Sequence, residues 1–242
     1  MDKQKGHLHP ITEAVARIYE IFREMGFDVA LGPEIETEFY NFDALNVPAD
    51  HPARDMQDTF WIKSVERKVL RTQTSAVQVR YMEKNKPPFR IIVPGKVFRN
   101  EATDATHEAQ FHQIEALAID KKISVANLKW TLDVFFEKFF GKKVKTRLRP
   151  SFFPFVEPGF ETDLSCFKCD GNGCDICKNT GWIEMGGSGL VHPFVLKSTG
   201  IDPEMWQGFA FGFGIDRLVM LKCGIEDVRM LYHADLRLIN QF

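Results

Sequence analysis

The chain has 242 residues, of which 44% are hydrophobic and 26% are charged, and this composition excludes a disordered or collagen-like protein. Its 31 Lys and Arg residues are balanced by 33 Asp and Glu residues, so we expect any contact with nucleic acid to be local or shared with a partner. No apolar run reaches the roughly 18–20 residues of a membrane span, and residues 1–9 are too polar for a signal peptide. We therefore expect a cytoplasmic protein that makes no membrane contact.

Four segments carry helix signals. Apolar residues at steps of three and four predict an amphipathic helix over residues 10–26, and a shorter helix is expected over residues 74–85. Ser124 is a suitable N-cap for a third helix, which Gly141 would end. A fourth helix is expected to begin at about Ile215.

Strand patterns lie between these helices. The predicted strands cover residues 89–98 (interrupted at Pro94-Gly95), 111–119, 182–191 and 208–214. Strands and helices do not alternate regularly, which argues against a parallel doubly wound sheet. The predicted fold is therefore α+β, with a mainly antiparallel sheet flanked by helices in one domain over residues 1–242.

A polar loop, residues 100–109, separates the first two strands, and both strands carry reactive groups at alternate positions. Alternation places Arg99 with Glu101 on one strand, and it places Phe111, Gln113 and Glu115 together on the other. A guanidinium can bind a phosphate through two hydrogen bonds, and an aromatic ring can stack on a base. The alternative is a hairpin whose polar face simply meets water, and these residues alone leave both interpretations open.

The strand over residues 208–214 separates its two faces sharply. Its phenylalanines point one way, whereas three glycines and Ala210 point the other, so a ligand could lie directly on the backbone. The string Gly212-Phe213-Gly214-Ile215-Asp216-Arg217 has two glycines but lacks the third of a dinucleotide fingerprint, and no βαβ unit surrounds it. We therefore reject a Rossmann nucleotide site.

Four of the five cysteines form two closely spaced pairs, Cys166 with Cys169 and Cys174 with Cys177. Each pair opens a nearly repeated, glycine-rich unit of eight residues, and two such knuckles can supply four thiolates to one tetrahedral zinc ion. We predict a structural zinc-knuckle insert over residues 166–181, in a loop between two core strands. The alternatives are reduced cysteines without a ligand, and iron–sulfur or redox chemistry.

Several strings together resemble a known family. The segment around Pro33, the string Phe98-Arg99-Asn100-Glu101 with its loop to Phe111, and the string ending at Arg217 resemble motifs 1, 2 and 3 of class II aminoacyl-tRNA synthetases. Five longer strings, in the same order from about residue 9 to residue 242, resemble the catalytic domain of bacterial phenylalanyl-tRNA synthetase alpha subunits. They cover residues 51–56, 70–75, 103–107, 111–115 and 153–159.

The resemblance implies a class II synthetase core that activates L-phenylalanine with ATP and Mg²⁺ and transfers it to tRNA(Phe). It also implies partners, either a beta subunit in an α2β2 assembly or a second copy of the chain. Alpha subunits of this family normally begin with a long helical hairpin that contacts tRNA. We expect this arm to be missing, because only nine polar residues precede Pro10.

The resemblance further implies roles at the nucleotide. Arg99 would hold the α-phosphate of ATP, and His107 and Arg217 would contact its outer phosphates or the adenine; these three are the expected catalytic residues. Phe111 would stack on the adenine, and Glu101 would orient it.

An amino-acid pocket is implied in the same way. Polar residues would hold the α-ammonium and carboxylate: Gln73, Ser75, Gln113 and Glu115. Apolar residues would surround the phenyl ring: Phe153, Phe155, Val156 and Ala210. Phe153 and Phe155 could instead be ordinary core, and Glu157 is expected to bind magnesium.

Three positions depart from the family pattern, and they put only detailed contacts in doubt. Gln73 stands where some relatives have histidine, Gln57 where some have tryptophan, and Asp216 where glutamate is usual. Two other functions stay open, a synthetase-like paralogue that only binds or regulates and a synthetase for another amino acid such as phosphoserine. The ATP-contact residues count against the first, and the absence of cations at the predicted phenyl pocket counts against the second.

Overall fold

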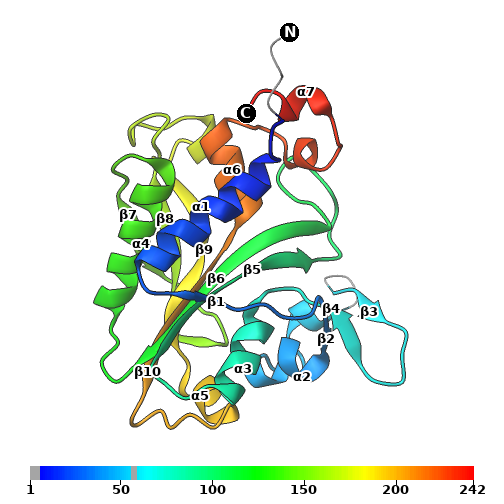
Figure 1. The fold of residues 1–242 in the computed structure, drawn as a ribbon, viewed down its shortest axis with the longest axis vertical. Coiled ribbons are helices and arrows are strands. Elements are labelled where there is room, and N and C mark those ends of the chain that lie inside the picture. Colours follow the sequence, from blue (N-terminus) through cyan, green and yellow to red (C-terminus); the bar gives the residue numbers. More distant parts are fainter. Residues whose placement is uncertain (1–5, 56–58) are drawn as a thin grey trace.

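A computed structural model describes residues 6–55 and 59–242. Its main sheet has seven strands in the order β1-β5-β6-β10-β9-β8-β7, and a small sheet has the order β2-β4-β3. Within the described residues β1 is parallel to β5, and the other neighbouring strands are antiparallel. The main strands are β1 (Asp28–Val29), β5 (Phe89–Phe98), β6 (Gln110–Asp120), β7 (Thr146–Pro150), β8 (Val156–Ser165), β9 (Trp182–Val191) and β10 (Gln207–Gly214) (Figure 1).

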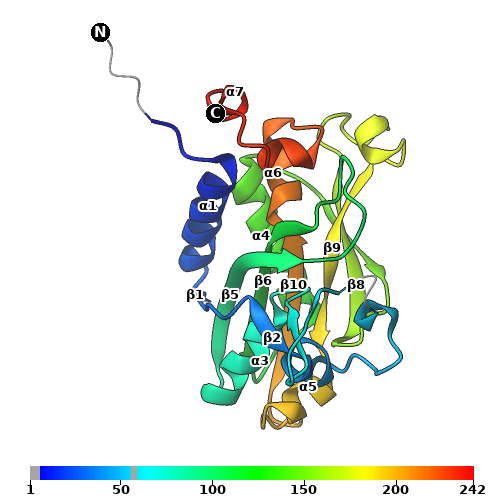
Figure 2. The ribbon, with the colours of Figure 1, turned by 90° about the vertical axis from the view of Figure 1, so that its right-hand side faces the viewer.

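Three long helices cover one face of this sheet (Figures 1 and 2). They are α1 (Pro10–Glu24), α4 (Val125–Phe140) and α6 (Ile215–Cys223). Many of the chain's phenylalanines lie in this layer, where rings from the helices and from β10 pack against one another. Phe22 and Phe135 stack with their ring centroids 5.0 Å apart, and Phe211 and Phe213 lie 5.2 Å apart. This helix-side core holds the sheet rigid behind its other face.

The opposite face is covered only in part, by a second apolar cluster. It is built from the small sheet, the connecting segments and short helices packed against Ile91, Val93 and Leu117 of the main sheet. The remaining elements are β2 (Ile35–Thr37), β3 (Trp61–Ile62), β4 (Lys68–Leu70), α2 (Glu38–Asn41), α3 (Ser75–Lys84), α5 (Pro193–Ser198) and α7 (Leu236–Ile239). The uncovered part of this face is where a ligand can reach the strands.

Most predicted elements are confirmed to within two residues, including the Ser124 and Gly141 caps of α4, with Gly141 in the left-handed region at φ 67°. One prediction was wrong, because β5 runs unbroken through Pro94. Among the described residues β5 has β6 on one side and β1 on the other, and β1 pairs only with Ile91 and Ile92. At Pro94 the position of the missing N–H therefore faces no partner strand. No helix within the described ranges is both long enough and apolar enough to cross a membrane.

Candidate active site

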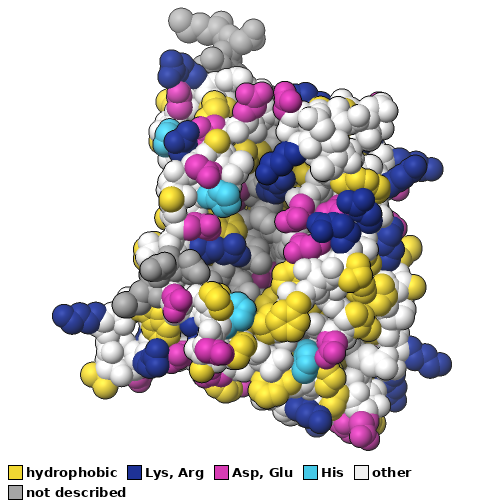
Figure 3. All heavy atoms as spheres, turned by 180° about the vertical axis from the view of Figure 1, so that it is seen from behind, with side chains coloured by type: hydrophobic (Ala, Val, Ile, Leu, Met, Phe, Trp, Pro, Cys, Tyr) yellow, Lys and Arg dark blue, Asp and Glu magenta, His cyan; other side chains and the backbone are white. Residues whose placement is uncertain are grey.

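A cavity of about 550 Å³ opens on the uncovered face of the main sheet. Strands β6, β8, β9 and β10 form its floor and one wall, and segments from residues 42–53 and 72–78 form the other wall. Figure 3 shows the molecule hollowed on this face, with charged side chains along the upper part of the hollow and hydrophobic ones below. The cavity therefore has a polar end and an apolar end.

The floor depends on glycine. A Cβ at Gly212 would lie 2.9 Å from both Gln113 Nε2 and Glu115 Cγ, and a Cβ at Gly187 would lie 2.9 Å from the Phe153 ring. The predicted bare face of β10 is confirmed, since Phe209, Phe211 and Phe213 are buried on the other side. Side chains of the neighbouring strands thus fill space that β10 leaves empty.

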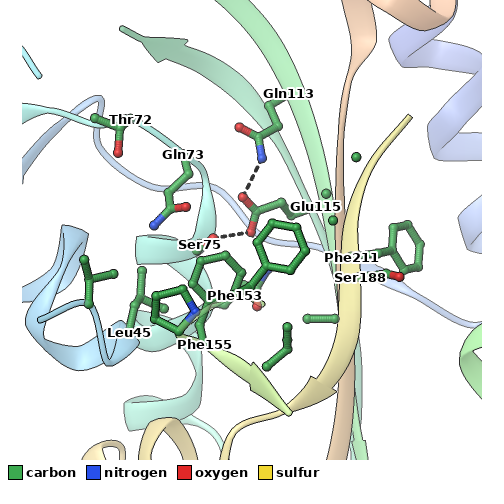
Figure 4. A pocket seen from close by; sticks show the side chains of 18 of the residues that line it. Leu45, Thr72, Gln73, Ser75, Gln113, Glu115, Phe153, Phe155, Ser188 and Phe211 are labelled. Atoms are coloured by element: carbon green, nitrogen blue, oxygen red, sulfur yellow. Dashed lines mark hydrogen bonds between the residues drawn. The ribbon is translucent and has the colours of Figure 1, made fainter. Parts of the chain in front are cut away.

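Glu115 is the electrostatic centre of the cavity. Its carboxylate is buried and accepts hydrogen bonds from Ser75 Oγ (2.7 Å), Gln78 Nε2 (2.6 Å) and Gln113 Nε2 (2.7 Å) (Figure 4). The backbone N–H of Thr74 also donates to it, at 3.1 Å. Burial raises the pKa of Glu115 more than these hydrogen bonds lower it, and the pKa reaches about 7.

Two features of this network suit a bound cation. The donors around Glu115 are neutral amide and hydroxyl groups, which do not cancel its charge. Gln113 Oε1 is buried and has no hydrogen-bond partner in the described structure. A bound ammonium group would neutralise the charge of the Glu115 carboxylate and donate a hydrogen bond to Gln113 Oε1.

The apolar end lies beside Glu115, as Figure 4 shows. The rings of Phe153 and Phe155 stack with centroids 6.0 Å apart, and Val156 and Ala210 line the same space. Sequence reasoning missed four further aliphatic residues of this wall, namely Leu45, Val47, Val191 and Val195. Their pattern is that of ordinary core residues, so no local signal could have identified them.

Arg99 and Phe111 lie together at the polar end. The Arg99 guanidinium stands 5.0 Å from the centre of the Phe111 ring, and its Nε donates to Thr72 O at 3.5 Å. Arg217 lies nearby on the rim of the sheet, where its Nε donates to Glu184 O at 3.0 Å, and burial lowers its pKa. A planar base can stack on an aromatic ring such as that of Phe111, with its phosphate groups against a guanidinium.

Four predicted site residues do not line the cavity, namely Arg217 on its rim and the residues Glu101, His107 and Glu157. β5 ends at Phe98, so the strand alternation that placed Glu101 with Arg99 no longer applies there, and Glu101 is exposed. His107 is exposed in the loop, with its Nδ1 3.0 Å from the Asp104 carboxylate. Glu157 points away to His192, with its Oε2 3.1 Å from His192 Nε2. Gln73 does line the cavity, whereas Gln57 lies outside the described residues.

Two carboxylates beside Arg217 were not predicted. Glu161 of β8 and Glu184 of β9 face the cavity side of the sheet, and Arg149 Nη2 reaches Glu184 at 3.1 Å. Partial burial and the nearby charge of Glu184 both raise the pKa of Glu161. Carboxylate oxygens are the ligands that Mg²⁺ takes together with a bound phosphate, so this pair is a candidate for the ion.

The four predicted cysteines converge between β8 and β9. Their sulfur atoms all lie within 4.8 Å of one another, with Cys166–Cys174 at 3.7 Å and Cys169–Cys177 at 3.8 Å. Tetrahedral ligation with Zn–S bonds of about 2.3 Å requires sulfur separations of about 3.8 Å. Although burial opposes it, N–H groups of Cys174 and Gly181 lower the pKa of Cys177 to about 6, so the donors fit a zinc ion.

Comparison with known proteins agrees with this geometry. The family model for the class II core domain (F) of tRNA synthetases matches residues 1–242. The phenylalanine–tRNA ligase alpha subunit of Caldanaerobacter subterraneus subsp. tengcongensis is 58% identical over 237 residues, which cover 98% of this chain and 69% of that protein. The corresponding subunits of Clostridium perfringens and Alkaliphilus metalliredigens are 56% and 55% identical, covering 98% and 99% of this chain and 69% and 70% of their own lengths.

The fold is also found in a solved structure of lower sequence similarity. The pyrrolysyl-tRNA synthetase of Desulfitobacterium hafniense superimposes with a TM-score of 0.68 at 18% identity, over 93% of this chain and 74% of that one. The main sheet, its open face and the extent of these matches lead to one conclusion. The chain belongs to the phenylalanine–tRNA ligase alpha subunit family of class II tRNA synthetases.

Proposed function

We infer that the chain activates L-phenylalanine with ATP and transfers it to tRNA(Phe), as the names of its relatives indicate. The observation that carries this proposal is the buried carboxylate of Glu115, whose hydrogen-bond donors in the described structure are all neutral, beside an apolar pocket walled by Phe153 and Phe155. An amino acid with an aromatic side chain offers both an ammonium group for the carboxylate and a ring for the pocket. Stacked and edge-on rings favour an aromatic ligand over an aliphatic one.

The first step joins the amino acid to the nucleotide. A carboxylate oxygen of phenylalanine attacks the α-phosphorus of ATP, the bond to the β-phosphate oxygen breaks, and pyrophosphate leaves with the bonding electron pair. Arg99, stacked over Phe111, is suited to hold the α-phosphate as charge builds on it, while the ring binds adenine. Arg217 would stabilise the departing phosphates, and we propose the same role for His107 of the loop.

Magnesium is the metal that a class II synthetase requires with ATP, and it neutralises phosphate charge. We propose that Glu161 and Glu184 hold this ion, because both lie on the cavity side of the sheet and Arg217 donates to the backbone carbonyl of Glu184. Glu157 is less suited to the role, since its carboxylate is paired with His192 outside the cavity. A pair of carboxylates with substrate phosphates is the usual environment for Mg²⁺.

Further partners follow from the family. We propose that the chain assembles with a beta subunit, in the cytoplasm where tRNA is charged, and that an α2β2 assembly rather than a dimer of this chain alone is the active form. We also propose that the four cysteines hold a structural zinc ion. The insert joins the far ends of β8 and β9, so the ion would stabilise the sheet and take no part in the reaction.

Replacing Arg99 tests the activation step. Arg99→Ala should slow ATP–pyrophosphate exchange by about 10²–10³-fold, with phenylalanine binding changed much less, because the contact strengthens as the phosphorus is attacked. Arg90→Ala removes an exposed arginine of β5, the strand that leads to Arg99, and should be nearly normal. Equal losses in the two variants would show that the effect is structural.

Glu115 predicts a pH dependence. The pKa near 7 means that a proton must leave Glu115 before the ammonium can bind, so phenylalanine affinity should fall about tenfold per unit below about pH 7. Titration calorimetry with phenylalanine alone, from about pH 5 to about pH 9, measures this. Glu115→Gln should bind weakly at every pH. A flat profile for the parent protein would contradict the assignment.

Ala210 predicts a selectivity change. It carries the only Cβ on the cavity side of β10, so Ala210→Gly should enlarge the pocket and admit para-chlorophenylalanine while keeping phenylalanine activation. The matched control is Ala118→Gly, which removes a methyl group from the helix-side core. Exchange rates with phenylalanine, tyrosine and para-chlorophenylalanine give the ratios, and unchanged ratios for Ala210→Gly would remove it from the pocket.

The zinc proposal has a direct test. Elemental analysis should find about one zinc ion per chain, and Cys169→Ser should melt earlier than the parent, because ligation by four thiolates contributes folding free energy. Cys223→Ser alters the one cysteine outside the cluster and should retain the metal. Zinc-free protein of full stability would refute the proposal.

A further inference from the structure

Asp216 is a buried carboxylate at the turn where β10 becomes α6. The residue is 3% exposed. One oxygen accepts a hydrogen bond from the backbone N–H of His112 at 2.7 Å, and the other accepts one from the Tyr232 hydroxyl. Burying a carboxylate costs several kcal/mol unless hydrogen-bond donors offset the lost hydration. The two donors to Asp216 are therefore needed to keep it in this position.

The strand register explains the first of these bonds. β6 pairs with β10 as far as the Gln113–Gly214 pair, and there the chain leaves the sheet to begin α6. The next amide of β6, that of His112, therefore lacks a partner on β10. The Asp216 carboxylate takes the place of that missing strand residue.

This bond spans the nucleotide site. Phe111 precedes His112 on β6, and Arg217 follows Asp216 on α6. One hydrogen bond thus ties together the two backbone positions that carry the proposed adenine-stacking ring and the proposed phosphate-binding guanidinium. A loosened Asp216 would let these two groups drift apart.

Tyr232 secures the second oxygen from the C-terminal segment. Its ring lies parallel to the His112 ring, with 6° between the planes, and its hydroxyl lies 3.2 Å from His112 Nδ1. Burial and the Asp216 charge raise the pKa of Tyr232, so its hydroxyl keeps its proton and donates. The same segment reaches the loop that carries His107, since Val228 N–H donates to Ala105 O at 2.8 Å.

We propose that residues 227–232 form a brace for ATP, in which Tyr232 acts through Asp216 to hold Phe111 and Arg217 in register and Val228 holds the loop of residues 100–109. Tyr232, His112 and Asp216 are positioning residues that do not touch the nucleotide. The proposal rests on the proposed function for the identity of the nucleotide. It also predicts that damage here is felt by ATP and spared at phenylalanine, because Glu115 and the two pocket rings are anchored elsewhere.

The test compares ATP with phenylalanine in the complex with the beta subunit. Tyr232→Phe removes one donor to a charged group, so the KM for ATP in pyrophosphate exchange should rise about tenfold while the KM for phenylalanine stays within about twofold. Asp216→Glu keeps a carboxylate and should retain more ATP affinity than Asp216→Asn. The control is Tyr19→Phe, which removes a hydroxyl from α1 on the same helix-side core and should change neither KM.

Two further measurements keep the outcome unambiguous. Val228→Pro removes the N–H that tethers the loop, at the first position of a short helix where proline is tolerated, and should also raise the KM for ATP. Val228→Ala keeps that N–H while truncating the same buried side chain, so it should leave the KM for ATP within about twofold of the parent. Calorimetry with Mg-ATP alone reports the brace even if exchange with phenylalanine is absent, which would instead refute the proposed function. The brace is overturned if ATP affinity in Tyr232→Phe stays within about twofold of the parent, or if both KM values rise equally.

Discussion

The two unlike faces of β10 are the constraint on which the rest of the structure depends. Its phenylalanines pack with rings from α1 and α4, and this core holds the strand in the middle of the sheet. Its other face is nearly free of side chains, so Glu115 and Gln113 of β6 can occupy the space above Gly212. Large residues at the glycine positions would fill the site and push its polar groups away.

Burial of Glu115 creates a second dependence. Burial raises the pKa of the Glu115 carboxyl group from its ordinary value in water to about 7. It does so even though four hydrogen-bond donors stabilise the ionised form. The ionised form of Glu115 is therefore disfavoured in the free site, and a bound cation would stabilise it. This preference for a cation and the adjacent apolar pocket together select a ligand with both an ammonium group and a ring, which is why polar and apolar ends must lie side by side.

The sequence predicted the strands and helices well where the pattern was long and regular, as in α1, α4 and β6. It failed at Pro94, because whether a strand tolerates proline depends on the neighbour that its N–H faces, and that neighbour is far away in the chain. The prediction that Glu101 shares a strand face with Arg99 failed because β5 ends at Phe98, and no local signal marks that end. The strands β7 and β8 were missed because their polar and proline-rich residues resemble a loop.

By itself, the sequence determined the residues whose chemistry is local. The paired cysteines predicted a metal-binding cluster because tight turns alone bring each pair together, and alternation alone placed Gln113 with Glu115. Tertiary structure decided everything that needs distant segments to meet. It turned Glu157 out of the cavity, brought Glu161 beside Glu184, added Leu45 and Val195 to the apolar wall and joined Asp216 to Tyr232. Spacing along the chain specifies which side chains share a strand face, whereas the packing of strands and helices decides which faces enclose a common space.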